Sequence, residues 1–196
     1  MIGILGLQGD VKSHCNILQK MGVESSVVRY PSQLDRVEGL IIPGGESSTM
    51  TNLMERMGFY KPLTEFAKSF PVLGTCAGLI LMAKQVKDSR VKPLGFLNVS
   101  VDRNGFGRQI HSFSETINVI ADKREQKIIA TFIRAPKISD IADSVEKLAE
   151  YNGEPIAVRE GKHIGLTFHP ELNGESIFHE LMIGKNISRE TIPNHQ

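Results

Sequence analysis

Short apolar segments alternate with amphipathic segments through the first half of the chain. Four of the apolar segments predict buried strands, and the spacing of apolar positions between them predicts helices. The expected strands cover residues 2–9, 24–30, 37–48 and 70–75, and the expected helices cover residues 11–22, 49–69 and 77–86. The second helix is interrupted near Gly58 and Pro62. This alternation predicts a parallel sheet that is covered on both faces.

The pattern changes beyond residue 87, where apolar and polar positions begin to alternate. Residues 93–120 and 127–138 alternate in this way and contain several glycines. Such alternation is typical of half-buried strands. We therefore expect antiparallel sheet or an inserted hairpin region at one edge of the parallel sheet.

The last part of the chain returns to an apolar strand pattern. Residues 155–171 predict a strand, a turn at residues 160–162 and a second strand, and residues 175–184 predict a closing helix. No repeat, low-complexity segment or linker interrupts the 196 residues. We therefore expect a single domain over residues 1–196, a three-layer αβα sandwich with a mostly parallel central sheet and extra antiparallel strands.

Composition and charge exclude several classes of partner. The net charge is +1 and aromatic residues make up 6% of the chain with no Trp, so we expect no nucleic-acid partner and no membrane surface. The N-terminus lacks the basic residues of a signal peptide, and no apolar run approaches the ~20 residues that span a bilayer. The two cysteines form no C-x-x-C pair. They predict neither a disulfide framework nor a metal site, and a cytoplasmic location follows.

Cys76 lies in the segment LGTCAGL, between a predicted strand and a predicted helix. Gly74 and Gly78 flank it two residues away on each side, which is the pattern of a nucleophile elbow. Free N–H groups at the start of a helix favour a thiolate over a thiol, and the N–H of Ala77 would face a developing oxyanion. Cys15 lies within a helical pattern without such a turn, so we expect a packing or half-exposed thiol there.

A thiolate nucleophile usually needs an imidazole base, which in turn needs an orienting group. His169 follows the apolar strand IGLTF at its carboxyl end, where open α/β sheets place their chemistry. Glu171 lies two residues further on, so in an extended chain both side chains project to the same side. The role of His111, beyond a glycine-rich loop, is left open. The remaining histidines are expected at the surface: His14, His163, His179 and His195.

A second glycine turn occurs in the segment IIPGGESST, after another predicted strand. Gly44 and Gly45 allow backbone N–H groups to approach a ligand closely. The segment is not a phosphate-binding loop, because the terminal Gly-Lys-Ser/Thr is absent. We expect this turn to supply the second oxyanion donor, which we assign to Gly45.

The segments PGGES, GTCAG and HPE, in this order, resemble the triad-type (class I) glutamine amidotransferases. The resemblance covers residues 2 to about 183. It implies a flavodoxin-like fold and hydrolysis of the side-chain amide of L-glutamine through a thioester, with ammonia passed to a partner synthase. It implies that Cys76 is the nucleophile, His169 the base and acid, and Glu171 its orienting group.

Three further segments, LGLQGDV, DRNGFGRQIHSF and FIRAP, resemble the glutaminase subunits of pyridoxal 5'-phosphate synthases. This implies that the partner is a (β/α)₈-barrel synthase subunit in a large hetero-oligomer, and that this chain holds no cofactor or metal. Arginines can bind the carboxylate of free glutamine with paired donors, and a glutamate can hold its ammonium group. The resemblance implies the following pocket residues for L-glutamine: Gly44, Gly45, Glu46, Arg103, Ile133 and Arg134.

Other functions stay open at this point. A glutaminase that serves another synthase would use the same triad, as would a cysteine peptidase with an open groove. A non-enzymatic sensor of related fold should lack the His-x-Glu pair. Two positions depart from the family pattern, Ser48 where Thr is common and His111 where an acidic residue is common. The role of Arg108, pocket or structural support, is also left open.

Overall fold

The computed structural model describes residues 1–103, 105 and 112–184. Seven strands form the central sheet in the order β10-β11-β12-β4-β3-β1-β2. Five of them are parallel: β1 (Ile2–Leu5), β2 (Ser25–Val28), β3 (Leu40–Ile42), β4 (Val72–Thr75) and β12 (His163–Leu166). Two antiparallel strands, β11 (Glu154–Glu160) and β10 (Glu146–Tyr151), complete one edge. The predicted α/β fold with a mostly parallel sheet is confirmed.

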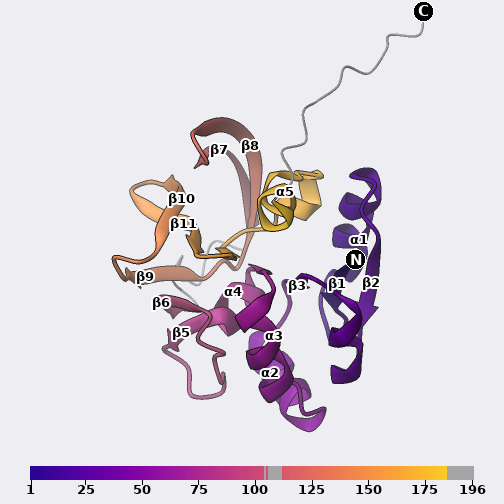
Figure 1. Cartoon of the computed structure of the whole chain (residues 1–196). Helices are drawn as coiled ribbons and strands as arrows, with labels where there is room; N and C mark the ends of the chain where they lie inside the picture. Colours follow the sequence, from indigo (N-terminus) through magenta and orange to yellow (C-terminus); the bar gives the residue numbers. More distant parts are fainter. Residues whose placement is uncertain (104, 106–111, 185–196) are drawn as a thin grey trace, which may run out of the picture.

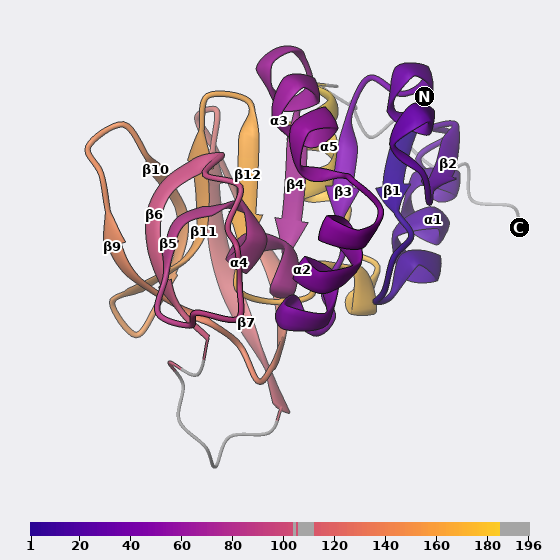
Figure 2. The ribbon, with the colours of Figure 1, turned by 90° about the horizontal axis from the view of Figure 1, so that it is seen from below.

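Different elements cover the two faces of this sheet (Figures 1 and 2). One face carries α1 (Val11–Lys20), α5 (Ile177–Ile183) and the hairpin of β7 (Ser112–Ala121) and β8 (Arg124–Ile133). The other carries α2 (Ser47–Arg56), α3 (Tyr60–Ser69), α4 (Ala77–Met82) and a small sheet of β5 (Ala83–Val86), β6 (Leu97–Asp102) and β9 (Lys137–Ile141). The short helices η1 (Pro31–Arg36) and η2 (Pro170–Asn173) lie in connecting segments.

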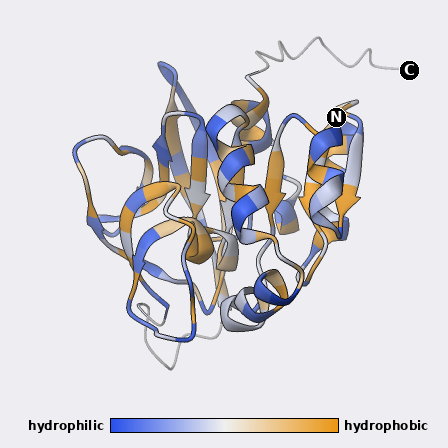
Figure 3. Ribbon diagram, turned by 60° about the horizontal axis from the view of Figure 1, so that its bottom comes forward, coloured by the Kyte–Doolittle hydropathy of each residue, from blue (hydrophilic) through white to orange (hydrophobic). Residues whose placement is uncertain are grey.

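The central strands separate two hydrophobic cores. Ile4 and Ile41 face the core under α1 and α5, whereas their neighbours Leu5 and Ile42 face the core under α2 and α4. Successive strand side chains point to opposite faces, so a strand buried on both sides must be apolar throughout. Figure 3 shows this apolar character in the strands, while the helices alternate apolar and polar stripes.

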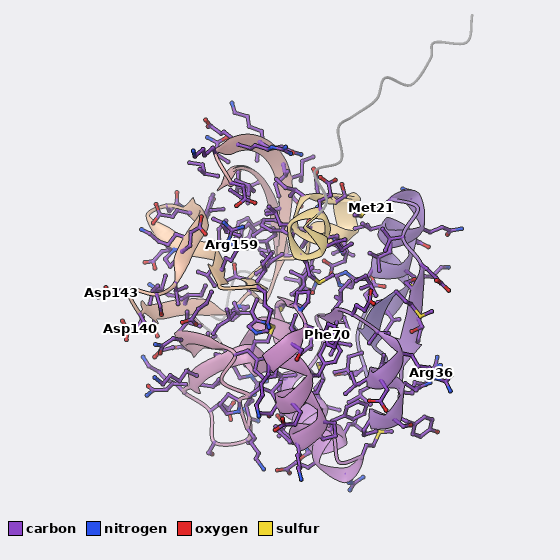
Figure 4. The ribbon with its side chains drawn as sticks, in the orientation of Figure 1. Met21, Arg36, Phe70, Asp140, Asp143 and Arg159 are labelled. Carbon is purple, nitrogen blue, oxygen red and sulfur yellow. The ribbon has the colours of Figure 1, made fainter. Side chains whose placement is uncertain are left out.

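Charged side chains project from the rim of the molecule. Arg36 lies on one side, and Asp140 and Asp143 lie on the other (Figure 4). The turn between β7 and β8 is also exposed, and Asp122 and Lys123 form it with φ of 49° and 64°. Within the described residues, no helix is long and apolar enough to cross a membrane.

Three details of the predicted elements were wrong. The helix predicted over residues 77–86 ends at Met82, because Ala83 begins strand β5 and pairs with Leu97 of β6. The last parallel strand ends at Leu166, and Glu171 lies in η2 instead. Strand β10 has no counterpart in the prediction, since only its pairing with β11 makes its mixed sequence a strand. The break near Gly58 is confirmed, with φ of 71° at that residue.

Candidate active site

Cys76 occupies a sharp turn between β4 and α4. Its backbone has φ 49° and ψ −101°, a conformation that is uncommon for a residue with a side chain. A Cβ atom on Gly78 would lie 2.0 Å from the carbonyl oxygen of Ile42, and one on Gly74 would lie 2.6 Å from the carbonyl carbon of Gly78. Both glycines are therefore required by close backbone packing, as an elbow predicts. The strain at Cys76 is typical of functional sites.

Backbone hydrogen bonds to neighbouring segments hold Cys76 and His169 in place. The N–H of Cys76 donates to the carbonyl oxygen of Leu166 at 2.8 Å, just where β12 ends. Three residues later, the N–H of His169 donates to the carbonyl oxygen of Thr131 on β8, also at 2.8 Å. The chain after β12 thus passes Cys76 and places His169 beside it.

His169 and Glu171 form a buried pair. The Nδ1–H of His169 donates to Oε1 of Glu171 at 2.7 Å, and the Glu171 side chain is fully buried. Burial lowers the pKa of His169, but hydrogen bonds with Cys76 and Glu171 and the charges of both groups raise it to about 10. The imidazole therefore lies between a sulfur and a carboxylate, and its charged form is strongly favoured.

The thiol side of the site faces the end of β8. As a thiol, Sγ of Cys76 approaches the carbonyl oxygen of Ile133 at 3.9 Å, a weak hydrogen bond at most. The next residue, Arg134, has φ of 43° and an exposed side chain. The backbone is thus in an uncommon conformation on both sides of this contact, at Cys76 and at Arg134.

The glycine turn after β3 lies against His169. A Cβ on Gly44 would lie 2.2 Å from Cε1 of His169, so only glycine fits there. The N–H of Gly44 donates to Oγ1 of Thr75 at 3.0 Å, and the N–H of Glu46 donates to Oε1 of Gln8 at 2.9 Å. Neither bond involves the N–H of Gly45. The oxyanion donors predicted at Gly45 and at Ala77, which begins α4, remain a prediction.

Glu46 and Arg103 are paired with each other. Glu46 caps α2 by accepting hydrogen bonds from the N–H and hydroxyl groups of Ser48 and Thr49. Burial raises the pKa of Glu46, but these hydrogen bonds outweigh that effect and lower the pKa to about 2. The guanidinium of Arg103 donates to Glu46 at 2.5 Å and to Asp88 at 2.6 Å. These two hydrogen bonds use two of the five N–H donors of the guanidinium.

The structure brings most of the predicted site residues together. Cys76, His169 and Glu171 meet beside Gly44 and Ile133, whereas the side chain of Arg134 points to solvent. Cys15 is half-buried, as expected. Arg108, His111 and His195, together with the GRQ segment, lie outside the described residues. Among the described residues, no group of three or more His, Cys, Asp or Glu side chains is arranged to hold a metal ion.

The prediction that His14 and His179 lie at the surface was wrong, because both are fully buried. His14 shares the inner face of α1 with Ile17 and Leu18, three and four residues further on. That spacing is the signal in the sequence that could have placed it inside. His163 is half-buried and stacks on Phe96, with 5.6 Å between the ring centroids, so it too is not a simple surface residue.

We expect Gly78→Ala to destabilise the fold. Alanine normally favours a helix over glycine, but here its Cβ would meet the backbone oxygen of Ile42 at 2.0 Å. The expected loss in free energy of unfolding is about 3 kcal/mol, the upper part of the range for overpacking. Gly22→Ala is the control, because it has open space but φ of 67°, and should cost only about 1 kcal/mol of backbone strain. Urea titrations that gave equal losses would contradict this account.

The raised pKa of His169 should make folding stability depend on pH. Between its ordinary value of 6.5 and about 10, the folded chain holds a proton that the unfolded chain has released. The stabilisation is therefore complete below pH 6.5 and is lost as the pH rises through 10. We expect the free energy of unfolding to exceed that of His169→Gln by on the order of a few kcal/mol near pH 6. That difference should narrow toward pH 10 in urea titrations, and a constant difference would disagree with the raised pKa.

The fold and the site define an α/β protein with a cysteine elbow beside a buried His–Glu pair. Residues 4–188 match the SNO glutamine amidotransferase family. The chain belongs to this family. The resemblance to glutamine amidotransferases inferred from the sequence is confirmed.

Several relatives are similar over nearly their whole length. The chain is 43% identical to the pyridoxal 5'-phosphate synthase subunit PdxT of Shouchella clausii, with 99% of each chain covered. It is 44% identical to the protein of the same name from Thermotoga neapolitana, over 93% of this chain and 97% of that one.

Solved structures agree with the observed fold. A crystal structure of a glutamine amidotransferase superimposes with a TM-score of 0.87 at 36% identity, over 93% of this chain and 97% of that one. The structure of PurLQS from Thermotoga maritima superimposes with a TM-score of 0.65 at 16% identity, covering 93% of this chain and 96% of that one. At that identity the likeness concerns the fold alone.

Proposed function

We propose that this chain is the glutaminase subunit of a pyridoxal 5'-phosphate synthase, working as a single domain. It hydrolyses L-glutamine to L-glutamate and ammonia, and the ammonia is used by a separate synthase subunit. The observation that carries the proposal is Cys76 on a strained elbow beside the buried pair of His169 and Glu171. The relatives named PdxT, at 43–44% identity, support the assignment to this pathway.

The first half of the reaction forms a thioester. The thiolate of Cys76 attacks the side-chain amide carbon of glutamine, and the electron pair of the C=O bond moves to oxygen. The N–H groups of Ala77 and Gly45 stabilise this oxyanion. His169, as imidazolium, gives its Nε2 proton to the amide nitrogen. The C–N bond then breaks, and ammonia leaves.

The second half restores the enzyme. The neutral imidazole of His169 takes a proton from water, and the hydroxide attacks the glutamyl thioester. The C–S bond breaks, glutamate leaves, and Cys76 returns as the thiolate beside a protonated His169. Glu171 stays ionised throughout, holds the Nδ1–H of His169 and stabilises the imidazolium.

Recognition of free glutamine uses charged groups on both sides of the elbow. Arg103 provides guanidinium donors for the α-carboxylate, and Glu46 provides a carboxylate for the α-ammonium group. The exposed side chain of Arg134 would have to turn toward the substrate to add a second guanidinium. Arg103 is already held by Glu46 and Asp88, so the substrate carboxylate uses the N–H donors that these two ion pairs leave available. Gly44, Gly45 and Ile133 line the side-chain end of the pocket.

Docking of a barrel-shaped synthase subunit regulates the chemistry. The Gly44–Gly45 turn is the proposed switch, since rotation of one peptide there adds or removes an oxyanion donor. Removal of such a donor typically costs ~10²–10³ in rate. The free subunit is therefore a weak glutaminase, and the complex is an active one that keeps ammonia from escaping.

The test measures glutamate and ammonia released from glutamine, with this chain alone and with the barrel subunit of pyridoxal 5'-phosphate synthase. We expect strong stimulation by the barrel. A diazoketone analogue of glutamine should alkylate Cys76 and leave Cys15 unmodified, as mapped by peptide mass spectrometry. Turnover that ignores the barrel would instead favour a glutaminase for another synthase. No turnover in the confirmed complex would refute the proposal.

A further inference from the structure

A pair of buried histidines lies directly behind the candidate triad. His14 on α1 and His179 on α5 are both fully buried, and Nδ1 of His14 is 3.0 Å from Nε2 of His179. On its other side, Nε2 of His14 is 3.6 Å from Oε1 of Glu171 and 3.5 Å from Oγ1 of Thr75. The proposed reaction uses neither histidine, although burying two imidazoles has a cost.

Burial favours the neutral form of both imidazoles at neutral pH. Burial lowers the pKa of His14, although the charges of Glu171 and Asp10 oppose this and that of His169 adds to it. Burial and the neighbouring His14 lower the pKa of His179 to about 3. Each ring therefore carries one N–H, and the positions of these two protons determine what the pair does.

The surroundings favour one arrangement of these protons. If His14 donated from Nδ1, its Nε2 lone pair would face the carboxylate oxygen of Glu171, and the N–H of His179 would lie on Nδ1. That Nδ1 is buried without a partner among the described residues, and a buried unpaired donor is costly. In the opposite arrangement, His179 donates from Nε2 to His14, and His14 presents its own Nε2–H toward Glu171 and Thr75. We assign this second tautomer.

Glu171 needs this support because only one of its two carboxylate oxygens accepts a hydrogen bond among the described residues. Oε1 receives the Nδ1–H of His169, whereas Oε2 is buried without a hydrogen-bond partner among the described residues. An N–H dipole from His14 stabilises the buried charge and opposes rotation of the carboxylate. The same N–H faces Thr75, whose hydroxyl accepts the N–H of Gly44 in the glycine turn. His14 thus lies beside Glu171, which holds His169, and beside Thr75, which holds the glycine turn.

We propose that His14, oriented by His179, is a positioning residue that holds Glu171, and through it His169, in the reactive geometry. This inference rests on the proposed function for the reaction that His14 would assist. The positions of His14, His179 and Glu171 do not depend on that function. His14 acts through Glu171 and does not touch the substrate.

Two polar substitutions separate positioning from packing. The amide of His14→Gln reaches the place of Nε2 and can donate toward Glu171. The shorter amide of His14→Asn reaches only the place of Nδ1, near His179. We expect His14→Asn to lower kcat for glutamine by roughly 10- to 100-fold, the usual effect of removing a partner from outside the reacting shell, and His14→Gln to retain most of it. Equal losses in the two variants, or no loss in either, would overturn the proposal.

A double-mutant cycle tests whether His14 acts through Glu171. In a Glu171→Gln background, His14→Asn should cause little additional loss, because the carboxylate that it holds is already gone. A full additional loss would overturn the proposal. His163→Asn is the control for a half-buried histidine elsewhere in the sheet, and it should leave kcat unchanged.

A titration without substrate makes the outcome independent of turnover. The pH at which the ring of His169 titrates, followed by NMR, should fall by about one pH unit in His14→Asn. It should stay unchanged in His163→Asn. If the unaltered complex fails to hydrolyse glutamine, the proposed function fails, and this titration still decides the role of His14. An unchanged His169 titration in folded His14→Asn would overturn that role.

Discussion

Replacement of Cys76 by alanine should abolish glutamine hydrolysis. The variant keeps the elbow but removes the sulfur that forms the thioester, so turnover should fall by more than roughly 10⁴-fold, as at other sites that lose a nucleophile. The fold should persist, because the N–H of residue 76 still donates to Leu166. The measurement is ammonia and glutamate release in the complex with the barrel subunit, with urea titration as the check on folding.

Cys15→Ala is the matched control. This second cysteine is half-buried on α1 and lies outside the elbow, so its replacement should leave turnover close to that of the unaltered protein. If Cys76→Ala kept most of its activity, Cys76 would be a packing residue and the thioester mechanism would be wrong. If Cys15→Ala lost as much, the loss in Cys76→Ala would not single out Cys76 as the nucleophile.

The second large effect should come from Glu171→Gln. The buried carboxylate accepts the Nδ1–H of His169 at 2.7 Å and contributes to the raised pKa of that imidazole. A neutral amide of the same size keeps the packing but removes the charge, and it can present an N–H where an acceptor is needed. We expect kcat to fall by on the order of 10³-fold or more. The pKa of His169, followed by NMR, should fall from about 10 toward its ordinary value.

Glu175→Gln provides the comparison for Glu171→Gln. Glu175 is half-buried four residues later, and its carboxylate accepts the N–H of Ile129 rather than the Nδ1–H of His169. The same change of charge there should leave both kcat and the His169 titration unaltered. Turnover of Glu171→Gln within tenfold of the unaltered protein would mean that His169 does not depend on this carboxylate.

The grouping of Cys76, His169 and Glu171 could be predicted from the sequence because its signals are local, while their catalytic roles remain a proposal. The spacing of Gly74 and Gly78 around Cys76 encodes a tight strand-to-helix turn without reference to the rest of the chain. The His-x-Glu pair is equally compact, although the expected extended chain at Glu171 proved to be part of η2. These local signals do not bring the Cys76 and His169 segments together. The parallel pairing of β4 with β12 does so.

Interactions between distant segments could not be predicted in this way. Arg103 meets Glu46 and Asp88 only after three loops have been placed, and no spacing in the sequence encodes that. The end of α4 at Met82 depends on β6 as a partner for the residues that follow. His14 differs from both cases, because its spacing from Ile17 and Leu18 places it on the buried face of α1, even though histidine is usually exposed.

The exposed turn at Asp122 and Lys123 lies between the two reactive side chains in the sequence. Cys76 precedes it and His169 follows it, while β7 and β8 pair along ten residues on either side. Exposed turns of this kind tolerate cleavage and insertion. A protein cut here would carry the proposed nucleophile on one polypeptide and the proposed base on another. Release of ammonia would then report the reassembly of two fragments, which makes this chain a natural starting point for a split-enzyme sensor.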